Sequence, residues 1–153
     1  MPFKGTLTAI VERFNATPIK AVFPNGIWFD MMPERNVAGA TIDVEVNGPF
    51  LVVADNGAQT EYNSEAAYIE RSSISFAAFG IGLTGAEESG AYVRNTYGPL
   101  WNTEAQGVRW LKFELTGHQV FMSALPTKSG KKVYYQQLDF SVERMASTAD
   151  WTT

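Results

Sequence analysis

A regular alternation near the middle of the chain, within residues 68–97, constrains the fold more than any other feature of the sequence. Ile74, Phe76 and Ala78 fall at every second position, with serine or alanine between them. A period of two places these three side chains on one side of an extended chain. They therefore predict a strand with one buried face.

A glycine-rich turn and a helix follow this strand. Gly80, Gly82 and Gly85 lie close together, and Thr84 with Glu87 has the spacing of a capping box, in which a hydroxyl and a carboxylate bind the first amides of a helix. The sequence thus predicts a strand, a glycine turn and a helix that packs closely on the sheet. The buried side of that helix carries small and apolar residues at helical spacing: Ala86, Gly90, Val93 and Tyr97.

The three glycines also match the G-x-G-x-x-G fingerprint of dinucleotide-binding proteins, in which amides at a helix N-terminus hold a pyrophosphate. Three features argue against this function. The strand alternates with serines, whereas the first strand of a doubly wound sheet is buried on both faces. Glu104 has about the spacing of the ribose-binding acid but lies in a polar segment, and the motif comes past the middle of the chain. We expect a turn that lets the helix fold back, and nucleotide binding through Gly80–Gly85 is the alternative.

Composition excludes several kinds of site. The 153 residues are 45% hydrophobic, which suits one domain that buries roughly two-thirds of its unfolded surface. There is no cysteine, so disulfides, thiolate catalysis and cysteine–zinc sites are excluded, and a single histidine excludes multi-histidine metal sites. The net charge of −4 argues against a protein whose main task is to bind phosphate. With no secretory leader and no membrane-spanning run in the sequence, we expect a cytoplasmic chain.

The residues before the central strand predict helices, strands and a projection. Apolar residues at helical spacing over 3–14 predict an amphipathic helix, and a short helical turn follows at 19–23. Residues 27–32 predict a short apolar strand, and alternation over 40–46 predicts another with an acidic outer face. Residues 48–66, a brief apolar run followed by polar residues, predict a projecting hairpin or loop.

The residues after the central helix predict further strands. Alternation over 110–115 predicts one strand, with Trp110 on its outer face, and Gly117 either bulges this strand or ends it. Residues 134–143 predict a long last strand, and 148–153 a flexible tail. We therefore expect a single α+β domain over residues 1–147, a mostly antiparallel sheet with two helices packed on one face and a projecting loop or hairpin.

No other motif carries a specific chemistry. His118 stands alone beside a glycine, and Lys128, Lys131 and Lys132 are typical of a solvated turn. Nothing in the sequence sets two carboxylates at a catalytic distance. We expect a protein that acts through its surfaces, with no catalytic residue, cofactor or metal. The sheet face away from the helices would carry Asp43, Glu45, Ser73, Ser75, Asp139 and Ser141.

Three stretches of the chain share the layout of a known family. Leu7–Trp28 reads LTAIVERFNATPIKAVFPNGIW and is followed by ATIDVEV, the centre reads YIERSSISFAAFGIGLTGAEESGAYV, and a turn leads into KKVYYQQLDFSVERM. In layout and apolar pattern these stretches resemble the tail-terminator (tail-completion) proteins of siphophages, over residues 5–145. The predicted projection over residues 48–66 is longer than in compact members of that family.

The resemblance implies a structural virion protein without enzymatic activity. Such a protein forms a homo-hexameric ring on the finished tail tube, stops the tube from polymerising and joins it to the head-completion (connector) protein. It would be assembled in the host cytoplasm and reside at the head–tail junction of the virion, with no membrane partner. DNA would pass through the bore without specific binding, which an acidic or uncharged lining favours.

A closed ring needs a heterologous interface, with two different patches on each subunit. The apolar projection and the strand at 27–32 are candidates for these patches. The alternatives are a small nucleotide-binding enzyme that uses Gly80–Gly85, and an adaptor domain of a cellular complex. Candidate subunit or partner contacts are Trp28, Phe29, Met31, Phe50, Leu51, Val52 and Trp101, and candidate DNA-facing residues are Asp43, Glu45 and Glu70.

Overall fold

The computed structural model describes residues 5–30, 43–62, 67–125 and 127–147. Met31, the first part of the strand predicted over 40–46 and the tail predicted over 148–153 lie outside the described residues. Within the described ranges, no helix is long and apolar enough to cross a membrane.

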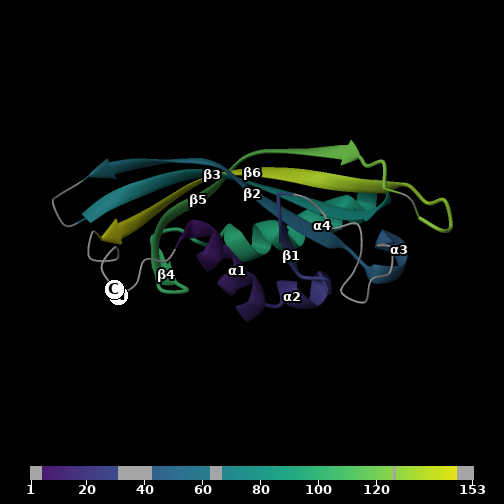
Figure 1. Ribbon diagram of the computed structural model, residues 1–153, viewed down its shortest axis with the longest axis horizontal. Coiled ribbons are helices and arrows are strands. Elements are labelled where there is room, and N and C mark those ends of the chain that lie inside the picture. The colour runs from purple at the N-terminus through teal and green to yellow at the C-terminus, as the bar shows by residue number, and fades with distance from the viewer. Residues whose placement is uncertain (1–4, 31–42, 63–66, 126, 148–153) are drawn as a thin grey trace.

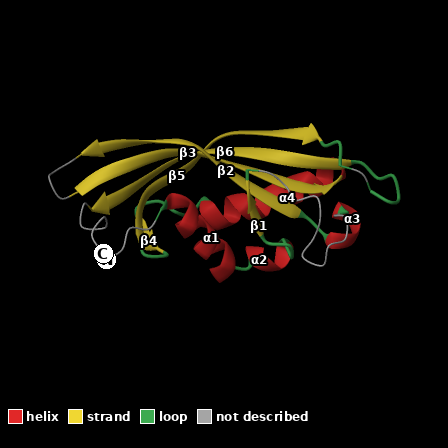
Figure 2. Cartoon of the chain, in the orientation of Figure 1, coloured by secondary structure: helices red, strands yellow, loops and turns green. Residues whose placement is uncertain are grey.

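One sheet with helices on one of its faces makes up the described part of the chain (Figure 1). In chain order the elements are α1 (Thr6–Ala16), α2 (Ile19–Val22), β1 (Ile27–Phe29), α3 (Val44–Asn47), β2 (Phe50–Tyr62), β3 (Ala67–Ile81), α4 (Gly82–Tyr97), β4 (Thr103–Ala105), β5 (Val108–Met122) and β6 (Val133–Ser147). The strand order is β1-β2-β3-β6-β5-β4, and only β1 and β2 pair in parallel. Figure 2 shows α1, α2 and α4 beneath the sheet. The other face is called the open face below, and the short helix α3 packs at one end of it, where Val44 clusters with Phe50 and Phe79. The predicted α+β fold class is confirmed.

The core lies between β3 and the helices, as the alternation of β3 predicts. Ile74, Phe76 and Ala78 of β3 are fully buried. The ring of Phe76 lies 4.9 Å from that of Tyr97 on α4, and the Tyr97 hydroxyl donates to the carbonyl of Ile10 on α1 at 2.7 Å. The first helix is confirmed, with its apolar side toward this core.

The chain around Asp43 differs from the prediction, because Val44–Asn47 forms the short helix α3 and not a strand. The Asp43 carboxylate accepts from the amide of Glu45 at 2.9 Å and from that of Val46 at 3.4 Å, which caps the helix. Such local bonds from an aspartate side chain compete with strand pairing. They outweigh the period-two pattern here.

The predicted projection over 48–66 is largely the strand β2. It pairs with β3 along its length, from Phe50 opposite Phe79 to Tyr62 opposite Tyr68. Phe50 belongs to the core, so the first half of the strand does not project. Residues 55–60 are exposed, and the end of the β2–β3 hairpin extends past the helices in Figure 1.

β5 is one continuous strand with two irregularities. Its register with β6 shifts between Trp110 and Lys112 and again between Leu115 and Gly117. The first shift adds a residue, so Trp110 and Phe113 both face the core, and the outward position predicted for Trp110 is wrong. The second shift confirms the bulge at Gly117.

Candidate functional site

The glycine turn joins β3 to α4 by packing backbone against backbone. A Cβ added to Gly80, in β3, would lie 2.5 Å from the carbonyl carbon of Gly85. Gly82 begins α4 with φ +70°, and its amide donates to the carbonyl of Lys132 at 2.9 Å. The predicted capping box at Thr84 is wrong, because α4 begins two residues earlier. The sheet that carries this turn is mixed and mostly antiparallel, unlike a doubly wound sheet.

Two of the residues predicted to face DNA, Asp43 and Glu45, instead bind the loop between β5 and β6. The amide of Lys128 donates to the Asp43 carboxylate at 2.9 Å, and this bond lowers the pKa of Asp43 below its ordinary value. The Ser129 hydroxyl donates to Glu45, whose carboxylate also lies 3.2 Å from the ammonium of Lys131. Both contacts lower the pKa of Glu45. Both side chains belong to the α3 segment and do not stand on a strand of the sheet, as the sequence predicted.

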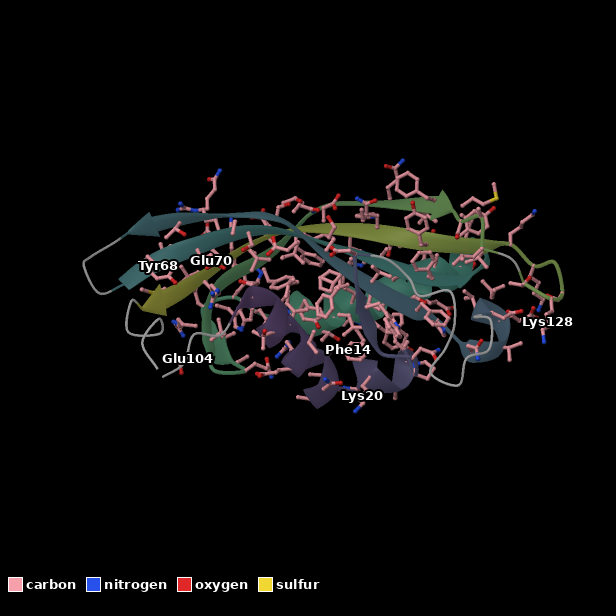
Figure 3. All side chains as sticks on the ribbon, viewed as in Figure 1. Phe14, Lys20, Tyr68, Glu70, Glu104 and Lys128 are labelled. Atoms are coloured by element: carbon pink, nitrogen blue, oxygen red, sulfur yellow. The ribbon has the colours of Figure 1, made fainter. Side chains whose placement is uncertain are left out.

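The third residue predicted to face DNA, Glu70, lies on the helix side of the sheet. Its carboxylate accepts from the guanidinium of Arg144 at 3.2 Å and from the hydroxyl of Thr6 at 3.0 Å. Arg144 is 3% exposed, so this is a buried ion pair near the start of α1. Figure 3 labels Glu70 near one end of the sheet and Lys128 at the other. The structure therefore does not bring the three predicted residues together on one surface.

The predicted contact residues of β2 belong to the interior. Phe50 and Leu51 are fully buried, and Val52 is nearly so. The prediction is wrong for Phe50 and Leu51, because the start of β2 lies between β1 and β3 in the sheet and does not project. Val52 lines an open hollow together with Ala77 and Phe79, and its contact with another chain stays a prediction. Trp28 of β1 is half-buried, and it packs against a small second cluster of the core.

Two of the predicted contact residues, Phe29 and Trp101, are surface residues, and each is 47% exposed. Phe29 ends the edge strand β1 and borders a shallow hollow of about 420 Å³, together with Leu7 and Val11 of α1. Trp101 lies in the turn between α4 and β4, the strand at the other edge of the sheet. The sheet therefore has an exposed aromatic residue near each edge.

The middle of the open face carries a hydrogen-bonded polar row across three strands. The Ser75 hydroxyl donates to the Asp139 carboxylate at 2.6 Å, and the side-chain amide of Asn56 donates to Ser75 at 2.7 Å. The side-chain amide of Gln137 donates to Asp139 at 3.2 Å. Ser75 and Asp139 thus lie on the open face as predicted, and their hydrogen bonds fix the carboxylate.

One end of the open face is aromatic, which the sequence did not predict. The Tyr135 ring lies 5.0 Å from that of Phe79 and 5.4 Å from that of Phe121. Beside them is an open hollow of about 470 Å³, lined among others by Ala77, Phe79, Met122 and Tyr135, which we call the aromatic hollow. The rings come from three strands, and only the strand register brings them together. That register was the missing signal.

Among the described residues, no three histidine, aspartate or glutamate side chains lie close enough together to hold a metal ion. His118 is exposed on β5. No protein-family model matches the chain, and no curated protein sequence matches it. The resemblance to tail terminators stays a prediction.

Proposed function

We propose that this protein is a tail terminator, a structural and non-enzymatic component of a siphophage virion. Copies of the chain form a hexameric ring on the end of the tail tube, stop its polymerisation and present a second surface to the head-completion protein. DNA passes through the bore without specific binding. The sequence resemblance suggests this function, and the described surfaces support it as follows.

The observation that carries the proposal is that exposed apolar side chains lie at separate places on the molecule. Phe29 ends the strand at one edge of the sheet, and Trp101 precedes the strand at the other edge. Met122, at the end of β5, is 62% exposed. A two-fold dimer uses the same patch on both subunits, whereas unlike patches support heterologous contacts, which generate rings or filaments.

The net negative charge of the chain supports a protein that lets DNA pass without binding it. Sixteen acidic residues outnumber twelve basic ones. An acidic balance weakens the counterion-release term that dominates nucleic-acid binding. The proposal therefore predicts that the protein does not bind linear double-stranded DNA in a gel-shift assay at about 0.15 M salt, the physiological ionic strength.

A tube-capping assay tests the proposed function. The tail-tube protein encoded in the same genome is allowed to polymerise with and without this protein, and tube ends are imaged by negative stain. We expect hexameric rings on the ends and tubes that stop growing, with the tube protein alone as control. Tubes that elongate at an unchanged rate and carry no rings would contradict the proposal, as would steady turnover of a nucleotide.

A further inference from the structure

We propose that β-bulges in β2 and β5 prevent copies of this chain from joining their sheets edge to edge. This role goes beyond the proposed ring and does not depend on it, because it concerns the backbone hydrogen bonds at the edges of the sheet. The unpaired edges, the location of the bulges and the side chains that hold the bulges each support it.

Long stretches of strand edge are unpaired in the described part of the chain. β1 pairs with β2 only over residues 51–53, and β4 pairs with β5 only over residues 108–110. No other described strand pairs with the outer sides of residues 54–62 and 112–122, which we call the free edges. A row of unpaired amides and carbonyls is a template for the strand of another chain. A fold of this kind therefore needs a means of keeping its free edges apart.

The β-bulges lie on the strands that carry the free edges and not on the strands between them. β2 has two residues, Asn56 and Gly57, where β3 has one, and β5 has one extra residue at Leu111 and another at Thr116. The central strands β3 and β6 pair along their whole length without a shift. A bulge bends its strand and increases the local twist, so a regular strand cannot follow the edge past it. Each free edge is thus interrupted within its length.

Side chains hold the bulge of β2 in place. Gly57 has φ +129°, a backbone conformation that residues with a Cβ rarely adopt. Its amide donates to the carboxylate of Asp55 at 2.9 Å, so this amide is not offered to a second chain. The side-chain amide of Asn56 donates to the hydroxyl of Ser75 on the open face at 2.7 Å. The bulge is therefore fixed by its own residues and by the neighbouring strand.

The free edge of β5 is protected by a bulge and by charge. The Thr116 hydroxyl donates to the carbonyl of Asp139 at 3.1 Å, which ties the extra residue to β6. The ammonium of Lys112 lies 3.4 Å from the carboxylate of Glu114 on the same strand. Charged residues, lysine above all, are a common means of protecting an edge. This edge needs protection because it ends at Met122, which is 62% exposed.

Deleting one residue at each bulge tests the proposal, because each deletion leaves a regular strand. Without Gly57, Asn56 alone lies opposite the one residue of β3, and without Thr116 the pairs on either side of it become consecutive. No side chain of the flanking pairs changes face. We expect each variant to show roughly twice the weight-average mass of wild type or more in light scattering, because its free edge now pairs with that of a second copy.

Hydrogen exchange shows whether the free edges are the surfaces that meet. Amides of residues 54–62 in the variant without Gly57, and of residues 112–122 in the variant without Thr116, should exchange more slowly at high than at low protein concentration. Deletion of Ser129, in the loop between β5 and β6 and outside both free edges, is the matched control. It should leave the mass and the exchange of both edges as in wild type.

Two results would overturn the proposal. Folded deletion variants with the mass of wild type would mean that the bulges do not prevent pairing. Association without slower exchange at the free edges would mean that the copies meet elsewhere. Circular dichroism shows whether each variant is folded, and the deletions on opposite sides of the sheet are independent tests. Neither result bears on the proposed ring, which tube capping by the wild-type chain tests.

Discussion

Substituting Gly80 by alanine tests whether the glycine turn serves packing. The new methyl group would lie 2.5 Å from the carbonyl carbon of Gly85, 2.6 Å from its oxygen and 2.9 Å from the amide of Ala86. All three atoms belong to backbone, so no side chain can rotate away. Gly85→Ala is the matched control, because its methyl group would lie 3.4 Å from the nearest atom, the carbonyl carbon of Gly80.

The expected cost follows from these distances. Carbon atoms in contact lie about 3.5–4.0 Å apart, so the start of α4 must withdraw from β3 by about 1 Å. Overpacking of this kind costs about 1–3 kcal/mol, and contact with backbone puts Gly80→Ala near 3 kcal/mol. In a chain of this length that lowers the melting temperature by about 6–12 °C. Gly85→Ala replaces a helical glycine and should be neutral or stabilising by up to about 1 kcal/mol.

Urea unfolding followed by far-ultraviolet circular dichroism measures both effects. A Gly80→Ala variant whose free energy of unfolding lies within about 0.5 kcal/mol of wild type would refute the packing argument. Changes that small are typical of surface substitutions and not of a methyl group placed against backbone atoms. Equal destabilisation by both variants would mean that something other than the Gly80 contact sets the distance between helix and strand. Neither result depends on any ligand, so the test separates packing from nucleotide binding.

Two further predictions concern charged groups. The pKa of Asp43 is lowered in the folded protein, so its stabilising contribution is present above the ordinary aspartate pKa, near pH 4, and is lost as the pH falls through the lower folded value. The urea midpoint of wild type should therefore fall more between about pH 5 and pH 3 than that of Asp43→Asn. Equal falls of the two midpoints would contradict the contact of Asp43 with Lys128. Glu70→Ala removes one partner of the buried Arg144 and should cost about 3 kcal/mol in the free energy of unfolding. Arg71→Ala, which breaks an ion pair on the open face, should cost at most about 1 kcal/mol, and similar costs for the two variants would show that burial of Arg144 is energetically unimportant.

Elements with a strong period were predictable from the sequence. β3 and α4 follow from residues 74–97 because each buries one face, and a buried face leaves a repeating apolar pattern. α3 was not predictable in this way, since the side chain of Asp43 caps it and the alternation at 40–46 also fits a strand. β2 was taken for a projection because its second half, residues 55–60, is exposed and so carries no apolar pattern. Strand pairing, and not burial, defines that half.

The candidate surfaces were less predictable than the fold, because they depend on strand register. Glu70 was predicted to face DNA, yet the pairing of β3 with β6 places it opposite Arg144 on the helix side. The aromatic hollow needs Phe79 and Tyr135 in one register across β3 and β6. Local sequence does not encode the partner of a strand position. Trp101, a predicted contact residue, is exposed in the structure, and its contact stays a prediction.

The placement of β6 between β3 and β5 has a consequence for how the chain acquires its structure. β2 and β3 are adjacent in the chain and form a hairpin. The other neighbour of β3 is β6, which lies far along the chain and pairs with it from Ile81 opposite Val133 to Ala67 opposite Ser147. Helix α4 follows directly and can cover the apolar side of β3, but one backbone edge of β3 remains unpaired until β6 is added. Proteins with such distant pairings fold slowly, on the scale of milliseconds to seconds, and expose aggregation-prone edges meanwhile. A newly made chain is therefore prone to aggregate through β3 until β6 pairs with it.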